Sequence, residues 1–320
     1  MKVPRSLVRT LRVVLLLVVL AFVVTALRRN GDEVLVALRR TGLVAAGGSL
    51  LAALVGLWAS AQVWRVLLVD LGSPVQRRPA LHIFFVGQLG KYIPGNVFAV
   101  AAQMSLGAQR GLSRSRIGTA SLLFMAMLVA AGLLVAAFCL PFTSPAALRG
   151  YGALLLVLPL GLACLAPPVL NRLVGLLLRA VRRAPLEQPM SARGIVAAMG
   201  WAIVMWIAYG GHVLILLGPH DLSPGRAGTL PLLATGAYAL AWTAGFLLVL
   251  APAGLGVREA VLVLALSPVL DEPVALTVAV LSRAVMTVGD LVWAALGAVL
   301  GRAGARGPVG IGQSSGVTSG

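Results

Sequence analysis

The stretch GKYIPGNV, residues 90–97, places one lysine and a Pro-Gly pair in the middle of an apolar segment, residues 81–109. A helix breaker at membrane depth frees backbone N–H and C=O groups that lipid cannot satisfy. Such a break is tolerated only where it is buried in protein or lines a water-filled cavity. Transporters hold substrate at broken helices of this kind. The stretch therefore predicts a membrane protein with an interrupted, functional helix.

A second break, APAGLGVRE at residues 251–259, lies inside another apolar segment, residues 230–268. We interpret the two breaks together, as the tips of two re-entrant helical hairpins. The residues expected to form the breaks are Pro94, Gly95, Pro252, Gly254 and Gly256.

The composition is that of an integral membrane protein. The chain is 59% hydrophobic and 11% charged, with a mean hydropathy of +0.98, whereas soluble domains carry about 25% charged residues. The formal net charge of +17 comes mainly from arginines in short loops between apolar runs. In that position they set membrane topology and meet anionic lipid headgroups. We therefore expect anionic membrane lipids as partners, and no nucleic acid.

The sequence gives no sign of a cofactor or of enzyme chemistry. Cys139 and Cys164 lie in apolar runs, the three histidines are scattered, and no metal-ligand spacing occurs. A GxxxxGK[ST] phosphate-binding loop is also missing from the sequence. We expect no metal, no cofactor and no catalytic residues. An enzyme acting on lipid would need a nucleophile or a metal cluster.

Apolar runs of about 20 residues can cross a bilayer, and six of them predict full spans. They fall at residues 11–27, 43–69, 117–140, 151–170, 195–217 and 274–300. Basic loops lie on the cytoplasmic side of such proteins. The expected cytoplasmic segments are the two termini and loops 70–80, 110–116 and 171–193. This topology requires one broken segment to enter and leave on the cytoplasmic side, and the other to do so outside. Loop 28–42 fits poorly, because it carries four arginines on the predicted outer side.

The two halves also align at a constant offset of 158 residues, which places Pro94 on Pro252 and Thr119 on Thr277. Opposite entry sides and a shared pattern are expected of an inverted-topology repeat, with halves at about 81–140 and 239–298. The predicted fold is thus an all-α polytopic membrane domain, residues 1–302. It has six transmembrane helices and two oppositely oriented re-entrant hairpins. The Gly- and Ser-rich tail, residues 303–320, is predicted to be disordered.

Ionisable residues at membrane depth cost several kcal/mol unless they are paired or wet, so they are functional candidates. We expect three cations to form a site for a lipid phosphate between the hairpins, and two carboxylates to orient those cations or to exchange a proton. The alternative is that these charges pair with one another and lock the bundle. The predicted substrate-binding residues are Lys91, Tyr92, Asn96, Arg258, Glu259, Arg283 and Asp290.

Residues 90–97 and 252–260 resemble the two motifs of the flippase-like membrane domain, also called the lysylphosphatidylglycerol synthase transmembrane region. The stretch from Arg283 to Asp290 resembles the last span of that family. The resemblance implies a multi-pass protein of the bacterial or archaeal cytoplasmic membrane. It also gives importance to the motif residues Lys91, Pro94, Gly95, Pro252, Gly254, Gly256, Arg258, Glu259 and Arg283.

The resemblance favours a lipid translocase that moves a phosphate-bearing lipid between leaflets through a central cationic cleft. That lipid would be a phospholipid, an aminoacyl-phospholipid or a polyprenyl-phosphate-linked lipid. The alternative is a non-transporting membrane scaffold, a partner of a glycosyltransferase or lipid-modifying enzyme. The chain departs from the family in two ways. It is expected to carry no aminoacyl transferase domain, and Phe124 and Met125 stand where an acidic-basic pair is common.

Overall fold

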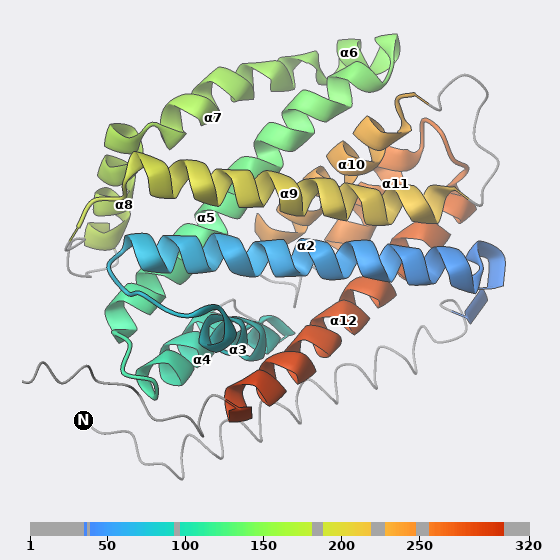
Figure 1. Ribbon diagram of the computed structural model, residues 1–320. Coiled ribbons are helices and arrows are strands. Elements are labelled where there is room, and N and C mark those ends of the chain that lie inside the picture. The colour runs from blue at the N-terminus through green and yellow to red at the C-terminus, as the bar shows by residue number, and fades with distance from the viewer. Residues whose placement is uncertain are drawn as a thin grey trace, which may run out of the picture.

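The computed structural model describes residues 35–36, 39–92, 97–180, 188–218, 228–247 and 256–303. Within these residues every regular element is a helix, which confirms the all-α prediction (Figure 1). The α-helices are α2 (Leu43–Asp70), α3 (Arg77–Gln88), α4 (Val97–Ala108), α5 (Arg114–Cys139), α6 (Pro145–Tyr151), α7 (Val157–Leu165), α8 (Pro167–Ala180), α9 (Ala192–Leu217), α10 (Leu230–Leu247), α11 (Val257–Leu266) and α12 (Glu272–Ala303). Three 3₁₀ turns join them, η1 (Leu89–Tyr92), η2 (Leu140–Thr143) and η3 (Gly152–Leu156).

Six described helical segments are long and apolar enough to cross a membrane. They are Leu43–Asp70, Arg114–Thr143, Ala147–Leu165, Ala192–Leu217, Leu230–Leu247 and Glu272–Gly301. Five of them overlap predicted spans, and the sixth predicted span, 11–27, lies outside the described residues. The new candidate is α10, which we expected to be the first arm of a broken segment. Its 18 residues extend about 27 Å, close to the thickness of a bilayer core.

Several connections that carry arginines lie at one end of the bundle, as hydrogen bonds between them show. We call this end the basic end. Arg116 Nη1 donates to the carbonyl oxygen of Gly72 over 2.6 Å, which joins the start of α5 to the end of α2. Asp70 accepts from the backbone N–H of Ser191 (2.8 Å) and from its hydroxyl (2.5 Å), so the start of α9 lies at this end. The long helices α2 and α9 therefore run antiparallel (Figure 1).

Helices α3 and α4 form a pair whose outer ends both lie at the basic end. His82 Nδ1 donates to the carbonyl oxygen of Gly297 (2.9 Å), and Arg110 Nη2 donates to that of Gly301 (3.1 Å). At the inner end of the pair, Tyr92 donates to Asp290. Asp290 precedes Gly301 by eleven residues, about 16 Å along α12. The pair thus extends roughly halfway along α12 and returns to the end where it began.

The inner end of this first pair requires a glycine. A Cβ on Gly90 would lie 2.5 Å from the backbone nitrogen of Ala99, and one on Gly87 would lie within 2.4 Å of the Gln103 side chain. Gln103 also accepts from Ser121 Oγ (2.6 Å), which in turn accepts from Trp64 Nε1 (3.0 Å). This buried chain attaches α4 to α5 and α2 and fixes the position of the pair.

Gly90→Ala is expected to destabilise the protein by about 1–3 kcal/mol, because the added methyl group meets backbone, which has little freedom to move away. The measurement is thermal unfolding of the detergent-purified protein. Gly200→Ala in α9 is the matched control, since nothing lies within 4 Å of its added Cβ and alanine favours a helix. A melting temperature that is unchanged by Gly90→Ala would show that the two arms can separate at no cost.

Helices α10 and α11 form a second pair at the opposite end. Gly236 packs against Cys139 and Leu140 at the end of α5, and Thr243 faces Gly132, seven residues back along α5. Helix α10 therefore runs from beyond the end of α5 toward its middle. Helix α11 returns to the start of α12, which follows within a short turn (Figure 1).

The ends and starts of corresponding helices lie 158 residues apart, which is the offset found in the sequence. Helices α4 and α11 end at Ala108 and Leu266, and helices α5 and α12 begin at Arg114 and Glu272, in each case 158 residues apart. Helix α5 begins at the basic end, whereas α12 ends there.

One predicted loop is wrong in its first part. We expected residues 171–193 to be a basic loop after a span ending at 170, but α7 ends at Leu165 and α8 occupies Pro167–Ala180. A proline in the first turn of α8 is compatible with a helix start, because the first backbone N–H groups of a helix have no partner within the helix. Arg172 and Arg179 stand on α8, whose opposite face is strongly apolar.

Candidate functional site

A cavity of about 120 Å³ lies where the inner ends of the two helix pairs meet. Its walls come from α2, α3, η1, α4, α5, α9, α10, α11 and α12. The residues that line it are Leu57, Ser60, Phe84, Phe85, Gln88, Lys91, Tyr92, Ala99, Phe124, Met125, Leu128, Tyr209, Trp242, Gly245, Phe246, Arg258, Arg283, Met286, Thr287 and Asp290. This central cavity has room for several water molecules or one small polar headgroup.

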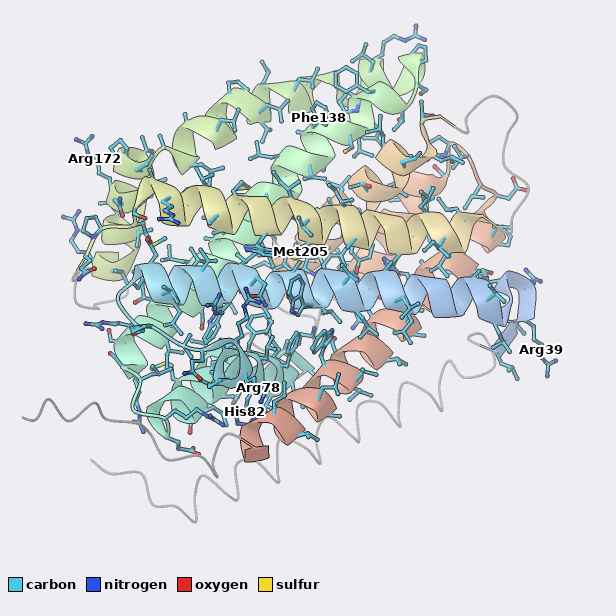
Figure 2. All side chains as sticks on the ribbon, in the orientation of Figure 1. Arg39, Arg78, His82, Phe138, Arg172 and Met205 are labelled. Carbon is cyan, nitrogen blue, oxygen red and sulfur yellow. The ribbon has the colours of Figure 1, made fainter. Side chains whose placement is uncertain are left out.

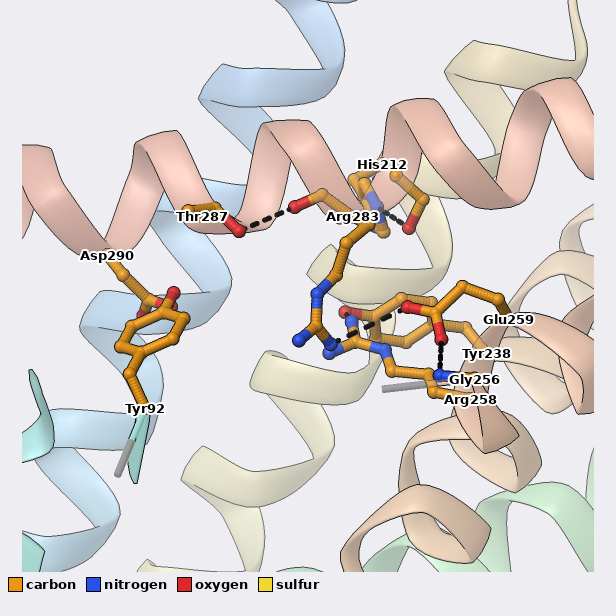
Figure 3. Close-up of polar contacts among 10 residues, drawn as sticks. Tyr92, His212, Tyr238, Gly256, Arg258, Glu259, Arg283, Thr287 and Asp290 are labelled. Atoms are coloured by element: carbon orange, nitrogen blue, oxygen red, sulfur yellow. Dashed lines mark hydrogen bonds and ion pairs between the residues drawn. The ribbon is translucent and has the colours of Figure 1, made fainter. Parts of the chain in front are cut away.

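Helix α12 gives the cavity a polar stripe. Arg283, Thr287 and Asp290 all line the cavity, as their spacing of four and three residues on a helix predicts. Thr287 Oγ1 donates to the carbonyl oxygen of Arg283 (2.9 Å) within the helix. The two charged side chains reach opposite parts of the cavity (Figure 3).

The first polar group joins α12 to the inner end of the first helix pair. Asp290 Oδ2 lies 2.6 Å from Lys91 Nζ and accepts a 2.7 Å hydrogen bond from the Tyr92 hydroxyl. The Asp290 side chain is only 8% exposed and that of Lys91 is 28% exposed. The carboxylate is thus held firmly, while the ammonium group keeps access to the cavity.

The second polar group lies at the start of α11. Glu259 Oε2 accepts from the backbone N–H of Gly256 (2.7 Å), which caps the first turn of the helix. Gly256 has φ +83°, a value that favours glycine. The other oxygen of Glu259 lies 3.6 Å from Arg283 Nη1. This ion pair ties the second helix pair to α12 (Figure 3), as the Lys91–Asp290 pair ties the first.

Arg258 makes its closest polar contact with a neutral group. Its Nη2 donates to the hydroxyl of Tyr238, and its guanidinium carbon lies 4.7 Å from the centre of that ring. The Tyr238 ring packs edge-on against the buried His212, 4.8 Å away between centres. His212 Nδ1 donates to the carbonyl oxygen of Tyr209 (2.7 Å), so in the neutral ring Nε2 accepts from Ser282 Oγ (2.9 Å). A buried polar chain from α9 and α12 thus fixes the tyrosine that holds Arg258.

The charges at the cavity do not cancel. Lys91, Arg258 and Arg283 carry three positive charges. Against them stand Asp290 and Glu259, which each contact a different one of these cations. The described ionisable residues of the site therefore sum to +1. A buried positive charge without a carboxylate is costly, and a ligand with one negative charge would neutralise it.

The remaining walls are apolar and aromatic. Phe84, Phe124 and Met125 come from α3 and α5, and Trp242 and Phe246 from α10. Trp242 and Phe246 stack in parallel with 5.1 Å between ring centres. A cavity with charged groups on η1, α11 and α12 and mostly apolar walls elsewhere suits an amphiphile, which has a charged group joined to apolar chains.

The structure brings six of the seven predicted substrate-binding residues to this cavity. Five line it, and Glu259 contacts the lining residue Arg283. The seventh, Asn96, and the predicted breaks Pro94, Gly95, Pro252 and Gly254 lie outside the described residues. Gly256 is described, and it caps α11. Within the described part of the chain, no group of three or more metal-ligating side chains occurs.

Sequence reasoning missed Tyr238, Tyr209, His212 and Thr287. They are isolated polar residues in apolar helices, with no motif around them. The one available signal was spacing on α12, because Thr287 lies between the two charged positions already chosen.

A search of curated proteins gave no match. The profile of one protein family, described as the lysylphosphatidylglycerol synthase TM region, matches residues 10–294. That range covers most of the chain, including both helix pairs and the central cavity. It confirms the resemblance carried by residues 90–97 and 252–260. The chain is therefore a membrane protein that belongs to the lysylphosphatidylglycerol synthase transmembrane-region family.

Proposed function

We propose that this protein is a translocase that moves a phosphate-bearing lipid between the leaflets of the cytoplasmic membrane. The observation that carries the proposal is the central cavity, where two helix pairs meet around three cations and two carboxylates. A phosphodiester carries one negative charge, which would balance the net charge of +1. The lipid tails stay in the bilayer while the headgroup passes through the cavity.

The proposal includes two re-entrant hairpins related by an inverted repeat. The first pair, α3–α4, opens to the basic end and the second, α10–α11, opens to the opposite end. Residues 158 apart occupy the cavity wall in pairs. These pairs are Phe84 and Trp242, Gln88 and Phe246, Met125 and Arg283, and Leu128 and Met286. Such pairing around a shared site supports a repeat whose halves approach the cavity from opposite leaflets.

The positive charge of the loops predicts how the protein is oriented in the membrane. Most of the loops that carry arginines lie at the basic end, although Arg39 and Arg40, before the start of α2, lie at the opposite end. Positively charged loops remain in the cytoplasm. We place the basic end in the cytoplasm, with both chain termini on that side. The first hairpin then enters from the cytoplasm and the second from outside, so a headgroup can reach the cavity from either leaflet.

Transport requires that the cations exchange partners. A lipid phosphate entering the cavity would compete with Asp290 for Lys91 and with Glu259 for Arg283. Each ion pair also ties a helix pair to α12, so exchange would loosen one pair at a time. Arg258, whose polar partner is the neutral Tyr238, would bind the phosphate without giving up a carboxylate.

The two ion pairs also favour a second candidate function, a scaffold that moves nothing and supports a lipid-modifying enzyme or glycosyltransferase. In that case the charges serve only to lock the helix pairs to α12, and phosphate never enters the cavity. The net charge of +1 is the feature that this alternative leaves unexplained.

The deciding experiment measures lipid movement across liposomes that hold the purified protein. The panel contains fluorescent phosphatidylglycerol, its aminoacylated form and a polyprenyl phosphate. Wild type is compared with Lys91→Ala and with Arg149→Ala, an exposed arginine on α6 far from the cavity. We expect wild type and Arg149→Ala to move one of the lipids, and Lys91→Ala to move it at a tenth of the rate or less. Folded wild-type protein that moves none of them favours the scaffold.

A further inference from the structure

A second cavity, of about 200 Å³, lies between α5, α7 and α8, away from the central cavity. It is lined by Thr119, Leu122, Leu123, Ala126, Met127, Ala130, Cys164, Leu165, Leu170, Leu173, Val174 and Leu178. No ionisable residue of the central cavity belongs to it. We call it the α8 cavity.

The walls of the α8 cavity are almost entirely carbon. Thr119 contributes the one hydroxyl and Cys164 the one thiol among the lining residues. A buried water needs two to four polar partners, and apolar cavities of this kind stay dry and take apolar ligands. An alkyl chain satisfies such walls, because it replaces empty space by van der Waals contact.

Helix α8 joins these walls to a cationic surface. Leu170, Val174 and Leu178, spaced by four residues, line the cavity. Arg172 and Arg179 are exposed on the other face of the helix, and Arg172 points away from the bundle in Figure 2. A helix with carbon on one face and arginines on the other is typical of the membrane interface, where it attracts anionic lipids.

Helix α8 lies at the basic end of the bundle. Asn171 Nδ2 donates to the carbonyl oxygen of Met190 (3.0 Å), and the Met190 N–H donates back to Asn171 Oδ1 (2.8 Å), just before α9 begins. In addition, the sequence contains no Asp or Glu between Asp70 and Glu187. The arginines of α8 therefore lie in a stretch of the sequence, residues 71–186, that contains no carboxylate side chain, and an anionic headgroup suits them.

The packing around the α8 cavity indicates what it binds. In the candidate span Ala147–Leu165, which includes α7, none of the most apolar 18-residue window is buried inside the protein. Helix α7 is thus weakly attached to the core, and the cavity separates α7 and α8 from α5. We propose that the α8 cavity binds one acyl chain of an anionic phospholipid whose headgroup lies against the arginines of α8. The bound lipid fills the space between α5 and α7–α8, and it is independent of any lipid that the central cavity moves.

The test uses phosphatidylglycerol and phosphatidylcholine that carry a photoactivatable diazirine on one acyl chain. The purified full-length protein is reconstituted with each lipid and irradiated, and the labelled residues are identified by mass spectrometry. We expect phosphatidylglycerol to label residues 119–130 and 164–178 at least five-fold more than phosphatidylcholine does. The exposed apolar residues of α9, such as Val196 and Ile207, report contact with bulk lipid and should be labelled equally by both.

Two variants separate the chain site from the headgroup site. Ala126→Phe places a ring in the cavity and should reduce labelling of residues 164–178 at least five-fold. Arg172→Gln with Arg179→Gln should remove the preference for phosphatidylglycerol while the cavity is still labelled. Arg149→Gln, on α6, is the control and should change neither. Equal labelling by both lipids that neither variant alters would overturn the proposal, because it would mean that only bulk lipid tails touch this face.

Discussion

Arg283→Ala is expected to reduce lipid movement by about 100-fold, equivalent to roughly 2.7 kcal/mol, and also to destabilise the protein. The arginine supplies one of the three cations at the central cavity, and its removal lowers the net charge from +1 to zero. It also leaves Glu259, at the start of α11, without the ion pair at 3.6 Å. Breaking a buried ion pair by removing one partner costs about 3–5 kcal/mol. The measurements are thermal unfolding in detergent and lipid movement in liposomes.

A double variant separates the two effects. Arg283→Ala with Glu259→Gln removes the unpaired carboxylate, while the amide oxygen of the glutamine can still accept the hydrogen bond from the Gly256 N–H. We expect this variant to recover most of the lost stability and none of the lost transport. Recovery of both would show that Arg283 serves only to neutralise Glu259 and does not itself bind the transported lipid.

The sequence predicted which charged residues lie together at the central cavity, because charges at membrane depth are rare. Lys91 and Asp290 lie 199 positions apart in the chain, yet both were chosen on cost alone, and the structure places them 2.6 Å apart. The pairing itself was not predictable. From the sequence, Asp290 and Glu259 were equally good partners for each of the three cations. Which carboxylate contacts which cation depends on where the helix pairs end.

The neutral residues of the site could not be predicted from the sequence. Tyr238 and His212 matter because a chain of contacts from Ser282 fixes them beside Arg258. Such a chain depends on helix packing, and nothing in an Ala- and Leu-rich segment marks it beforehand. Helix α8 was missed for a different reason. Its arginines were interpreted as a cytoplasmic loop, although the leucines between them have helical spacing.

Segment length also has limits as evidence, as α10 shows. Its 18 residues are long enough to cross a membrane, while its contacts with α5 run from Gly236, against Cys139, to Thr243, against Gly132. We expect the contacts of α10, and not its length, to decide how deep it reaches. The hairpin prediction depends on this register, and the break at residues 251–259 alone does not establish it.

Asp290→Asn is expected to strengthen lipid binding and to slow lipid movement. The change raises the net charge of the site from +1 to +2 and releases Lys91 Nζ for a phosphate. Its cost in stability should be small, because asparagine still accepts from Tyr92 and the partly exposed lysine can reach solvent through its flexible stem. We expect about ten-fold more anionic lipid to remain bound after purification, measured by native mass spectrometry. We also expect an initial rate of movement about ten-fold lower.

The opposite changes in binding and rate are the informative result. A translocase must release its lipid as well as bind it, so a carboxylate that competes for Lys91 speeds release, and its loss traps the lipid in the cavity. A scaffold has no release step, so Asp290→Asn would alter stability alone. Asp271→Asn, an exposed acid in the turn before α12, is the matched control and should change neither quantity. If Asp290→Asn leaves the amount of bound lipid unchanged, phosphate does not reach Lys91 and the proposed route through the central cavity is wrong.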